Sequence, residues 1–441
     1  MSNTVMIISL AVGLVLALVI STKFSINAGL LGFVVAWIVG CWMGNLSFAT
    51  LIGYWPSSVM FIAISTALFF GVARENGTFD LFARKIMYSC RSASWAVPFA
   101  LYVATWLIGA SGAGGMGSEI PMSAIGFAIA AQTGMNPLLV ILAVFLGGMG
   151  GGGMFWSAEG ANRIAYYSQV GGVVTDDVVA YSTLAHSVYT IIIYTILFII
   201  GYLVFKGWKI DSKNLVMEKP EPFNKEQKTT LTLIGIGLIL VIGTSIWKCF
   251  WPSATSKFLA NCFCIQMVCV IGFLIAVAMK LANYKAVMKR IPWDMILNIG
   301  GMSVMIKVLM NCGITDVVAN IFEANIPNII IPVLFFVIAG VITLFSNFTV
   351  IYPLLMPLVP VVAAATGCNS VSLFAAMAMG SGLPAVSPFS TGGVCCLSGA
   401  PDDETRQKLI PKQFVMSLII MAITALLLMT PIIQIFPDCL G

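Results

Sequence analysis

Four short segments gather small and polar residues inside regions that are otherwise strongly apolar. They read GASGAGGMGSE at 109–119, GGMGGGGMFWSAEGAN at 147–162, FSNFT at 345–349 and GSGLPAVSPFSTGG at 380–393. Glycine in a helix costs about 1 kcal/mol relative to alanine, and prolines such as Pro384 and Pro388 remove helical hydrogen bonds. Backbone groups freed in this way are tolerated in a bilayer only where they line a cavity or bind a ligand. The segments therefore predict helices broken at the membrane midplane around a polar site.

Two glutamates stand next to these glycines. Glu119 ends the first segment, and Glu159 follows the glycines at 147–153. A carboxylate at membrane depth costs roughly 2.5 kcal/mol or more, so it is a functional candidate by default. Glu159 is expected to coordinate a cation, carry a proton or pair with Arg163. We expect the glycines before it to unwind a helix rather than to form a packing surface.

The composition requires a polytopic, all-helical membrane protein. Of 441 residues, 59% are apolar and only 9% are charged, whereas globular proteins have about 25% charged residues. The first apolar run has no basic leader or cleavage site, so we expect a retained span. Apolar runs predict helices near 5–22, 28–44, 57–73, 136–147, 184–205, 229–247, 260–280, 294–310, 369–382 and 413–435.

The chain consists of two similar halves separated by a polar linker at 206–228. Pro56, Gly77, Asp80 and Ala83 recur 236 positions later as Pro292, Gly313, Asp316 and Ala319. With a shift of 233, Thr133, Gly134, Asn136, Ala143, Gly147, Ser157 and Gly160 recur as Thr366, Gly367, Asn369, Ala376, Gly380, Ser390 and Gly393. A shared order over this length indicates duplication, with repeats at 1–205 and 229–441.

Two further apolar regions, 94–133 and 327–366, have a polar tip near their centre and form either two crossing helices or a re-entrant hairpin; we expect the hairpin. Each repeat then has five crossings, one hairpin and one broken helix (136–168 and 369–398), and the repeats are inverted. Of the 22 Lys and Arg residues, 18 fall on the linker face and four on the other, namely Arg163, Lys248, Lys257 and Lys307. The positive-inside rule makes the linker cytoplasmic and both termini external. Inverted repeats with hairpins are typical of secondary transporters.

Three stretches resemble the ion transporter superfamily: 291–322, FSNFTVIYPLLMP at 345–357, and 380–393. The resemblance is to its divalent anion:sodium symporters and malonate-type dicarboxylate carriers. It implies an elevator-type carrier, usually a homodimer, in which a transport domain holding both hairpins moves against a scaffold domain. It also implies a carboxylate between the hairpin tips, with sodium beside each tip.

The resemblance implies two sets of site residues. The Ser-Asn-Thr pattern of such tips matches Ser346 and Asn347, with Thr349 displaced by one position; the first tip lacks it, so either Ser111 or Gly115 stands opposite Asn347. The carboxylate is expected at Ser111, Gly115, Ser157, Asn162, Ser346, Asn347, Thr349, Ser390, Thr391 and Gly392. Sodium is expected at Gly114, Gly117, Ser118, Glu159, Gly160, Ser387 and Gly393.

We therefore expect a secondary active transporter of small di- or tricarboxylates, such as malonate, malate or succinate, in a bacterial-type inner membrane. Sodium is the expected coupling ion and the proton its alternative. A cation/proton antiporter of the same superfamily, with Glu159 as the ion-binding acid, is the alternative function. Paired hairpins disfavour an ion channel. The chain has no nucleotide loop, zinc-protease motif or catalytic serine pair, so we expect no enzyme, no cofactor and no nucleic-acid partner.

Overall fold

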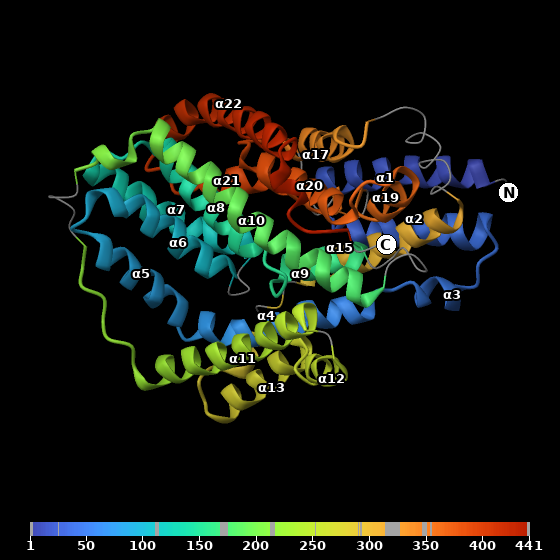
Figure 1. The fold of residues 1–441 in the computed structure, drawn as a ribbon, viewed down its shortest axis with the longest axis horizontal. Coiled ribbons are helices and arrows are strands. Elements are labelled where there is room, and N and C mark those ends of the chain that lie inside the picture. Colours follow the sequence, from blue (N-terminus) through green and yellow to red (C-terminus); the bar gives the residue numbers. More distant parts are fainter. Residues whose placement is uncertain are drawn as a thin grey trace.

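The computed structural model describes residues 3–24, 26–110, 114–167, 175–211, 217–251, 253–289, 291, 293–313, 327–345, 351–352 and 355–438. Within these ranges the chain is helical and contains no strand (Figure 1). The elements of the first half are α1 (Asn3–Phe24), α2 (Ala28–Trp37) with a π-helical extension (Ile38–Met43), α3 (Phe48–Gly53), α4 (Ser57–Glu75), α5 (Thr78–Cys90), η2 (Ser94–Ala96), α6 (Val97–Ile108), α7 (Gly114–Thr133), α8 (Pro137–Gly152), α9 (Ala158–Tyr167), α10 (Asp176–Val204) and η4 (Gly207–Lys209). Those of the second half are α11 (Lys225–Phe250), α12 (Ala254–Cys262), α13 (Ile265–Ala278), α14 (Tyr284–Met288), α15 (Trp293–Asn311), α17 (Ile330–Thr343), α19 (Leu358–Thr366), α20 (Ser370–Gly382), η5 (Leu383–Val386), α21 (Thr391–Leu397), α22 (Asp403–Leu428) and η6 (Pro431–Gln434).

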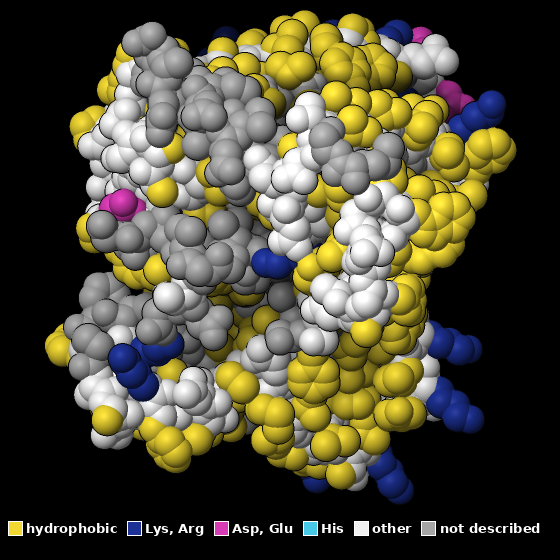
Figure 2. All heavy atoms as spheres, turned by 90° about the vertical axis from the view of Figure 1, so that its right-hand side faces the viewer, with side chains coloured by type: hydrophobic (Ala, Val, Ile, Leu, Met, Phe, Trp, Pro, Cys, Tyr) yellow, Lys and Arg dark blue, Asp and Glu magenta, His cyan; other side chains and the backbone are white. Residues whose placement is uncertain are grey.

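Each apolar run singled out in the sequence coincides with a helix, which confirms the all-helical polytopic class. Among the described residues, five helices are long and apolar enough to cross a membrane, or six if α12 and α13, bent by 42°, form one span. The other runs form shorter apolar helices, including α8 and α2 with its extension. Hydrophobic side chains cover much of the face shown in Figure 2, where charged side chains are few. Such a surface is suited to lipid rather than to water.

The duplication seen in the sequence is also visible in the helix boundaries. Both ends of α4 and α15 are offset by 236 residues. The starts of α8 and α20, and those of α9 and α21, are offset by 233. The same offsets therefore relate both the residue types and the elements that they form.

The repeated Thr-Gly-x-Asn sequence builds the same turn twice. Gly134 and Gly367 have φ values of +70° and +68°, a left-handed conformation that glycine adopts without strain. Two residues later an asparagine side chain caps the next helix: Asn136 accepts a hydrogen bond from Leu138 N–H, and Asn369 accepts one from Val371 N–H, both at 2.9 Å. A helix stop followed by a helix start explains why these residue types recur together.

The first hairpin, formed by α6 and α7, starts and ends on one side of the molecule. Near its start, the Tyr202 hydroxyl donates to the carbonyl of Trp95 at 3.2 Å. At its end, Asp211 N–H donates to the carbonyl of Thr133 at 3.1 Å. Tyr202 and Asp211 flank the end of α10, so both arms of this hairpin open toward the linker.

The far end of this hairpin stops beside the middle of α10. Trp156, which follows α8, donates from Nε1 to the carbonyl of Ala110 at 2.8 Å. Its neighbour Phe155 donates from its N–H to Ser187 Oγ at 2.9 Å, and Gly153 packs beside Thr190. Ser187 and Thr190 lie near the centre of the 29-residue helix α10. The hairpin thus turns back at mid-height, as a re-entrant hairpin does.

The second hairpin, which contains α17 and α19, opens on the opposite side. At its base, Asn328 Nδ2 donates to the carbonyl of Thr366 at 3.0 Å, in a pocket that also includes Thr430 beyond the end of α22. The start of α22 lies at the other side, where Lys412 lines a groove together with Val204 at the end of α10. The two hairpins therefore enter from opposite sides, which agrees with inverted repeats.

The helices pack in two groups around these hairpins. One group pairs α2 with α15, and α4 with α13 and α14, while α11 packs on α13. The other group pairs α6 and α7 with α8, α17 with α20, and α10 with both α8 and α20. Figure 1 shows α4, α11 and α13 along one edge of the molecule and α17 and α22 along the opposite edge. Both hairpins thus belong to a single group with α8 and α20, whereas α9, which follows the break after α8, packs chiefly on α4 of the other group.

Candidate functional site

The glycines at 147–152 lie inside α8 and are buried, so the expectation that they unwind the helix was wrong. A Cβ on Gly147 would lie 2.5 Å from the carbonyl oxygen of Tyr102 in α6. On the other face of α8, a Cβ on Gly148 would lie 2.8 Å from Ser118 Oγ in α7. Only glycine permits this approach, and the gain in close packing outweighs its low helix propensity. The glycines are therefore the surface on which both hairpin arms pack.

The interruption comes directly after the glycines, at 153–157, before α9 begins. Ser157 bridges the gap, because its hydroxyl donates to the carbonyl of Gly152 and accepts from Gly160 N–H, the latter at 3.0 Å. Arg163 donates from Nη1 to the carbonyl of Gly153 at 2.7 Å. A cation at a helix C-terminus complements the partial negative charge of its free carbonyls.

Arg163 also connects this break to the second half of the chain. Its Nε donates to the hydroxyl of Tyr352 at 2.9 Å, and the guanidinium carbon lies 5.5 Å from the centre of that ring. Arg163, predicted to be one of four charges on the external face, instead has a buried side chain, with 3% exposed. Arg163 and Glu159 attract each other electrostatically, while the hydrogen bonds of Arg163 go to a carbonyl and a phenol.

Glu159 binds the first hairpin tip directly. Its Oε1 accepts a hydrogen bond of 2.8 Å from Gly115 N–H, in the first turn of α7. A carboxylate is favourable there because the first N–H groups of a helix have no intrahelical acceptor and carry partial positive charge. The N–H of Gly115, expected to serve a substrate carboxylate, is thus already bound to a carboxylate of the chain itself.

Glu119 places a second carboxylate beside the first. Both carboxylates lie beside Gly115. A Cβ added to Gly115 would be 3.3 Å from Oε1 of Glu119 and 3.4 Å from Oε1 of Glu159. Glu119 is fully buried and Glu159 is 4% exposed. Within the described part of the chain, neither oxygen of Glu119 and only one of Glu159 has a hydrogen-bond partner. Buried carboxylate oxygens without donors are ligands suited to a hard cation such as sodium, so the residues present fit the expected ion.

The other residues expected at sodium near this tip contribute backbone oxygens or serve the helix itself. Gly114 opens α7 with a φ of +70°. Ser118 Oγ donates back to the carbonyl of Gly115 at 2.8 Å, and Gly117 lies on the same turn. The Ser118 hydroxyl therefore hydrogen-bonds within its own helix. The oxygen atoms available to a cation at this tip come chiefly from the two glutamates.

The second break separates α20 from α21 and contains the 3-10 turn η5. Ser387 Oγ donates to the carbonyl of Leu344 at 2.6 Å, which fixes this break to the arm leading to the second tip. Phe345, the residue after Leu344, packs against Phe414 near the middle of α22, with the two ring centres 6.1 Å apart. Like the first, the second hairpin arm therefore ends at mid-height.

The residues expected at the substrate after this break open α21. Ser390 is the N-cap position, Thr391 is exposed, and Gly392 is buried against the ring of Phe145. Gly393 packs closely on the carbonyl of Ser387. The described contacts hold this segment against α8 and leave Thr391 open to a ligand.

Several expected residues lie outside the described part of the chain. They are Ser111 of the first tip, and Ser346, Asn347 and Thr349 of the second; Asn162 is part of α9, but its side chain also lies outside. Their roles remain predictions.

The structure adds polar residues that the sequence reasoning missed. Gln413 of α22 is buried and donates from Nε2 to the carbonyls of Val386 and Gly393, at 2.6 and 3.2 Å. Tyr352 is linked to the first break through its hydrogen bond from Arg163. Tyr194 lies at the second break, with its hydroxyl beside Gly382. A buried glutamine within an apolar run was a usable signal for Gln413, whereas nothing local marked the tyrosines.

Fold and site together define a polytopic membrane carrier. Its marks are two oppositely entering hairpins whose arms end beside two broken helices at mid-height.

Comparison with known proteins agrees with this class. Residues 1–152 match the family model described as dicarboxylate carrier protein MatC N-terminus, which confirms the resemblance to malonate-type carriers. The fold is similar to the crystal structure of the Alcanivorax borkumensis YdaH transporter, with a TM-score of 0.65 and 17% identity over 89% of each chain. No curated protein matches the sequence. Both matches are to transport proteins rather than to enzymes, as the sequence led us to expect.

Proposed function

We propose that the chain is a cation-coupled secondary active transporter of small di- or tricarboxylates, with malonate, malate and succinate as candidate substrates. The observation that carries this proposal is the meeting of opposed hairpins and broken helices at mid-height. Such an arrangement can open alternately to either side of a membrane. The match of the first 152 residues to a dicarboxylate carrier supports a carboxylate as the transported group.

In this proposal the substrate carboxylate binds on the side of the second tip. Ser346, Asn347 and Thr349 supply hydroxyl and amide donors, and the exposed Thr391 at the start of α21 supplies a further hydroxyl. The hydrogen bond between Arg163 and Tyr352 brings a positive charge close to the chain that follows the second tip. Positive charge and hydroxyl donors favour an anion at that place.

The coupling cation binds at the first tip, between Glu119 and Glu159. Like charges repel each other more strongly in a protein interior than in water, because the effective dielectric constant is lower there. A bound cation offsets that repulsion, so a carboxylate substrate binds well only when the cation is present. The geometry therefore supports symport, with sodium as the first choice and the proton as the alternative.

A cation/proton antiporter is the second candidate, and one observation favours it. Glu159 already occupies the N–H of Gly115, so the first tip carries an acidic ion site without needing an organic anion. In this alternative, sodium and protons compete for the glutamates, and carboxylates have no effect on either.

The proposal extends to the organisation of the carrier in its membrane. The helix group that holds both hairpins is the moving domain of an elevator, and the group around α2, α4 and α13 is its scaffold, through which two copies form a homodimer. The linker at 206–228 is cytoplasmic and both termini are external, in a bacterial inner membrane, as the distribution of Lys and Arg favours.

Ligand-dependent stability tests the proposal and separates the two candidates. The melting temperature of the purified protein is measured with malonate, malate, succinate, citrate or acetate, each in sodium chloride and in choline chloride. Because coupling between two ligands is reciprocal, a symporter is stabilised by a dicarboxylate more strongly in sodium than in choline. Stabilisation by sodium alone, unchanged by every carboxylate, would favour the antiporter.

A further inference from the structure

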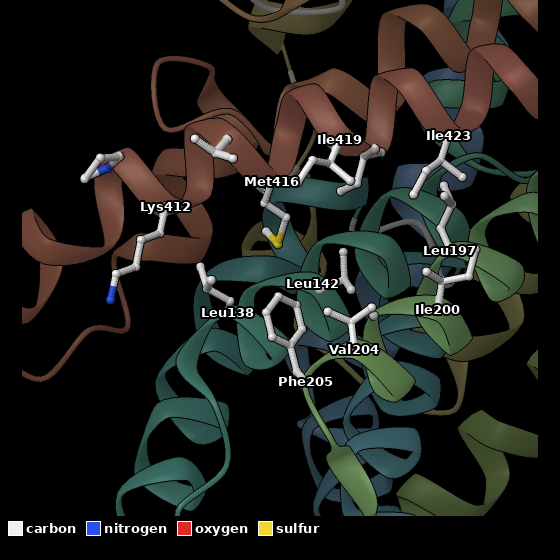
Figure 3. Close-up of a pocket in the computed structure, with 14 residues that line it drawn as sticks. Leu138, Leu142, Leu197, Ile200, Val204, Phe205, Lys412, Met416, Ile419 and Ile423 are labelled. Atoms are coloured by element: carbon white, nitrogen blue, oxygen red, sulfur yellow. The ribbon is translucent and has the colours of Figure 1, made fainter.

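An apolar groove lies between α10, which ends on the side of the linker, and α22, which begins on that side. It has a volume of about 510 Å³ and lies between the start of α8, the second half of α10 and the middle of α22. Figure 3 shows side chains of α22 facing those of α8 and α10 across it, with Lys412 at one end of the row. Apart from Lys412 and a glycine, every lining residue has an apolar side chain.

The groove opens outward, toward the surface that faces lipid. Its floor is formed by buried side chains such as Leu142 and Met416. Its rims are exposed, with Val204 of α10 at 65% and Val415 of α22 at 54%. Both α10 and α22 are long and apolar enough to span the bilayer, so hydrocarbon can enter the groove from the side.

One end of the groove lies at the level of lipid headgroups. Trp208, which follows α10, and Trp95, at the start of the first hairpin, are 43% and 61% exposed. The two are joined through Tyr202, whose ring lies 5.9 Å from that of Trp208 and whose hydroxyl donates to the carbonyl of Trp95. Exposed tryptophans and tyrosines gather at the boundary between hydrocarbon and headgroups.

The charge at this end is positive and available. Arg406 and Lys408 are occupied by ion pairs within α22, with Asp403 at 3.1 Å and Glu404 at 2.5 Å. Lys412, one turn further along the helix, is exposed and has no hydrogen bond or ion pair within the described residues. A lysine at the headgroup end of an apolar groove is complementary to a lipid phosphate that carries no compensating positive charge.

We propose that this groove binds one acyl chain of an anionic phospholipid, whose phosphate lies at Lys412. The apolar walls account for the acyl chain, and Lys412 accounts for the preference for an anionic headgroup. Because α10 packs on α8, and α22 packs on α8 and α17, both walls belong to the group that holds the hairpins, and the lipid would be carried with that group. The proposal does not depend on which substrate is transported.

Native mass spectrometry of the detergent-purified protein tests the proposal by counting bound lipids. We expect phosphatidylglycerol to be retained in preference to phosphatidylcholine. Lys412→Gln should weaken binding of phosphatidylglycerol about fivefold, which corresponds to the roughly 1 kcal/mol that one lysine contributes near an anionic lipid. Lys285→Gln removes the same charge from α14, which packs on α4, and should leave binding unchanged.

The groove itself is tested by filling it. Val204→Trp and, from the opposite wall, Val415→Trp should reduce binding of both lipids. Leu203→Trp, at an adjacent position that is 53% exposed and does not line the groove, should not. Equal retention of both lipids by the unmodified protein, or an equal loss in Lys412→Gln and Lys285→Gln, would overturn the proposal. A change from dimer to monomer in Val204→Trp with unaltered lipid binding would assign the groove to a second copy and overturn it as well.

Discussion

Replacing Gly147 with alanine tests whether the glycines of α8 are a packing surface. The added Cβ would lie 2.5 Å from the carbonyl oxygen of Tyr102, whereas van der Waals contact is comfortable only at about 3.5 Å. α6 and α8 must therefore separate by about 1 Å, since neither backbone can rotate away. Overpacking of this kind costs about 1–3 kcal/mol.

The matched control is Gly235→Ala in α11, where a Cβ would have no atom within 4 Å. Both variants gain the same helix propensity, about 1 kcal/mol, so the difference between them isolates the packing cost. At about 2 °C per kcal/mol, we expect Gly147→Ala to melt about 2–6 °C below Gly235→Ala in the same detergent. The assay is thermal unfolding followed by size-exclusion chromatography at a fixed heating rate.

The corresponding glycine of the second half extends the test. A Cβ on Gly380 would overlap the carbonyl of Phe336 in α17, so Gly380→Ala should lose stability as Gly147→Ala does. Equal melting temperatures for Gly147→Ala and Gly235→Ala would refute the packing argument. The glycines would then have to be explained by local unwinding, as the sequence first indicated.

Three further variants probe the site and its supports. Glu159→Gln keeps an acceptor for Gly115 N–H but removes the negative charge. The stabilisation by sodium relative to choline, about 2.7 kcal/mol when sodium is at a hundredfold excess over its Kd, should therefore disappear. If sodium still raised the melting temperature of this variant, Glu159 would have a structural role only. Asn369→Ala removes the cap of α20 and should lower stability by about 1 kcal/mol in thermal unfolding, and an unchanged melting temperature would contradict the capping argument. Asn347→Ala should abolish uptake while the protein still elutes as a folded species, and wild-type uptake would exclude Asn347 from the substrate site.

The sequence predicted those parts of the fold that local chemistry determines. The Thr-Gly-x-Asn turn at Thr133 and Thr366 needs only a glycine that adopts positive φ and an asparagine that caps the next helix. Both effects act within a few residues, so the pattern can be recognised in each half and aligned. Apolar runs likewise reveal the helices, because the bilayer sets their length.

The glycines of α8 show where such local reasoning fails. Their low helix propensity favours unwinding, but α6 and α7 approach them closely enough to compensate. That compensation depends on residues about 30 to 45 positions away, Ser118 and Tyr102, and no propensity scale includes them. Tertiary packing therefore decided between two readings that the local sequence left open.

The candidate site was predicted in its residue types but not in its connections. Glu159 was identified because a carboxylate in an apolar region is costly, yet its partner, Gly115 N–H, is 44 residues distant. The hydrogen bond from Arg163 to Tyr352 spans 189 residues and joins the two repeats. Neither contact produces a periodic or local signal, so only the folded arrangement of the two repeats reveals them.

Uptake into proteoliposomes tests the central claim most directly. Purified protein is reconstituted, and entry of labelled malonate, malate, succinate and citrate is followed under an inward sodium gradient, an inward proton gradient or no gradient. The account predicts accumulation of at least one dicarboxylate that depends on the sodium gradient, or on the proton gradient if protons are coupled. Failure to take up any carboxylate under every gradient, together with sodium-driven proton movement, would contradict it.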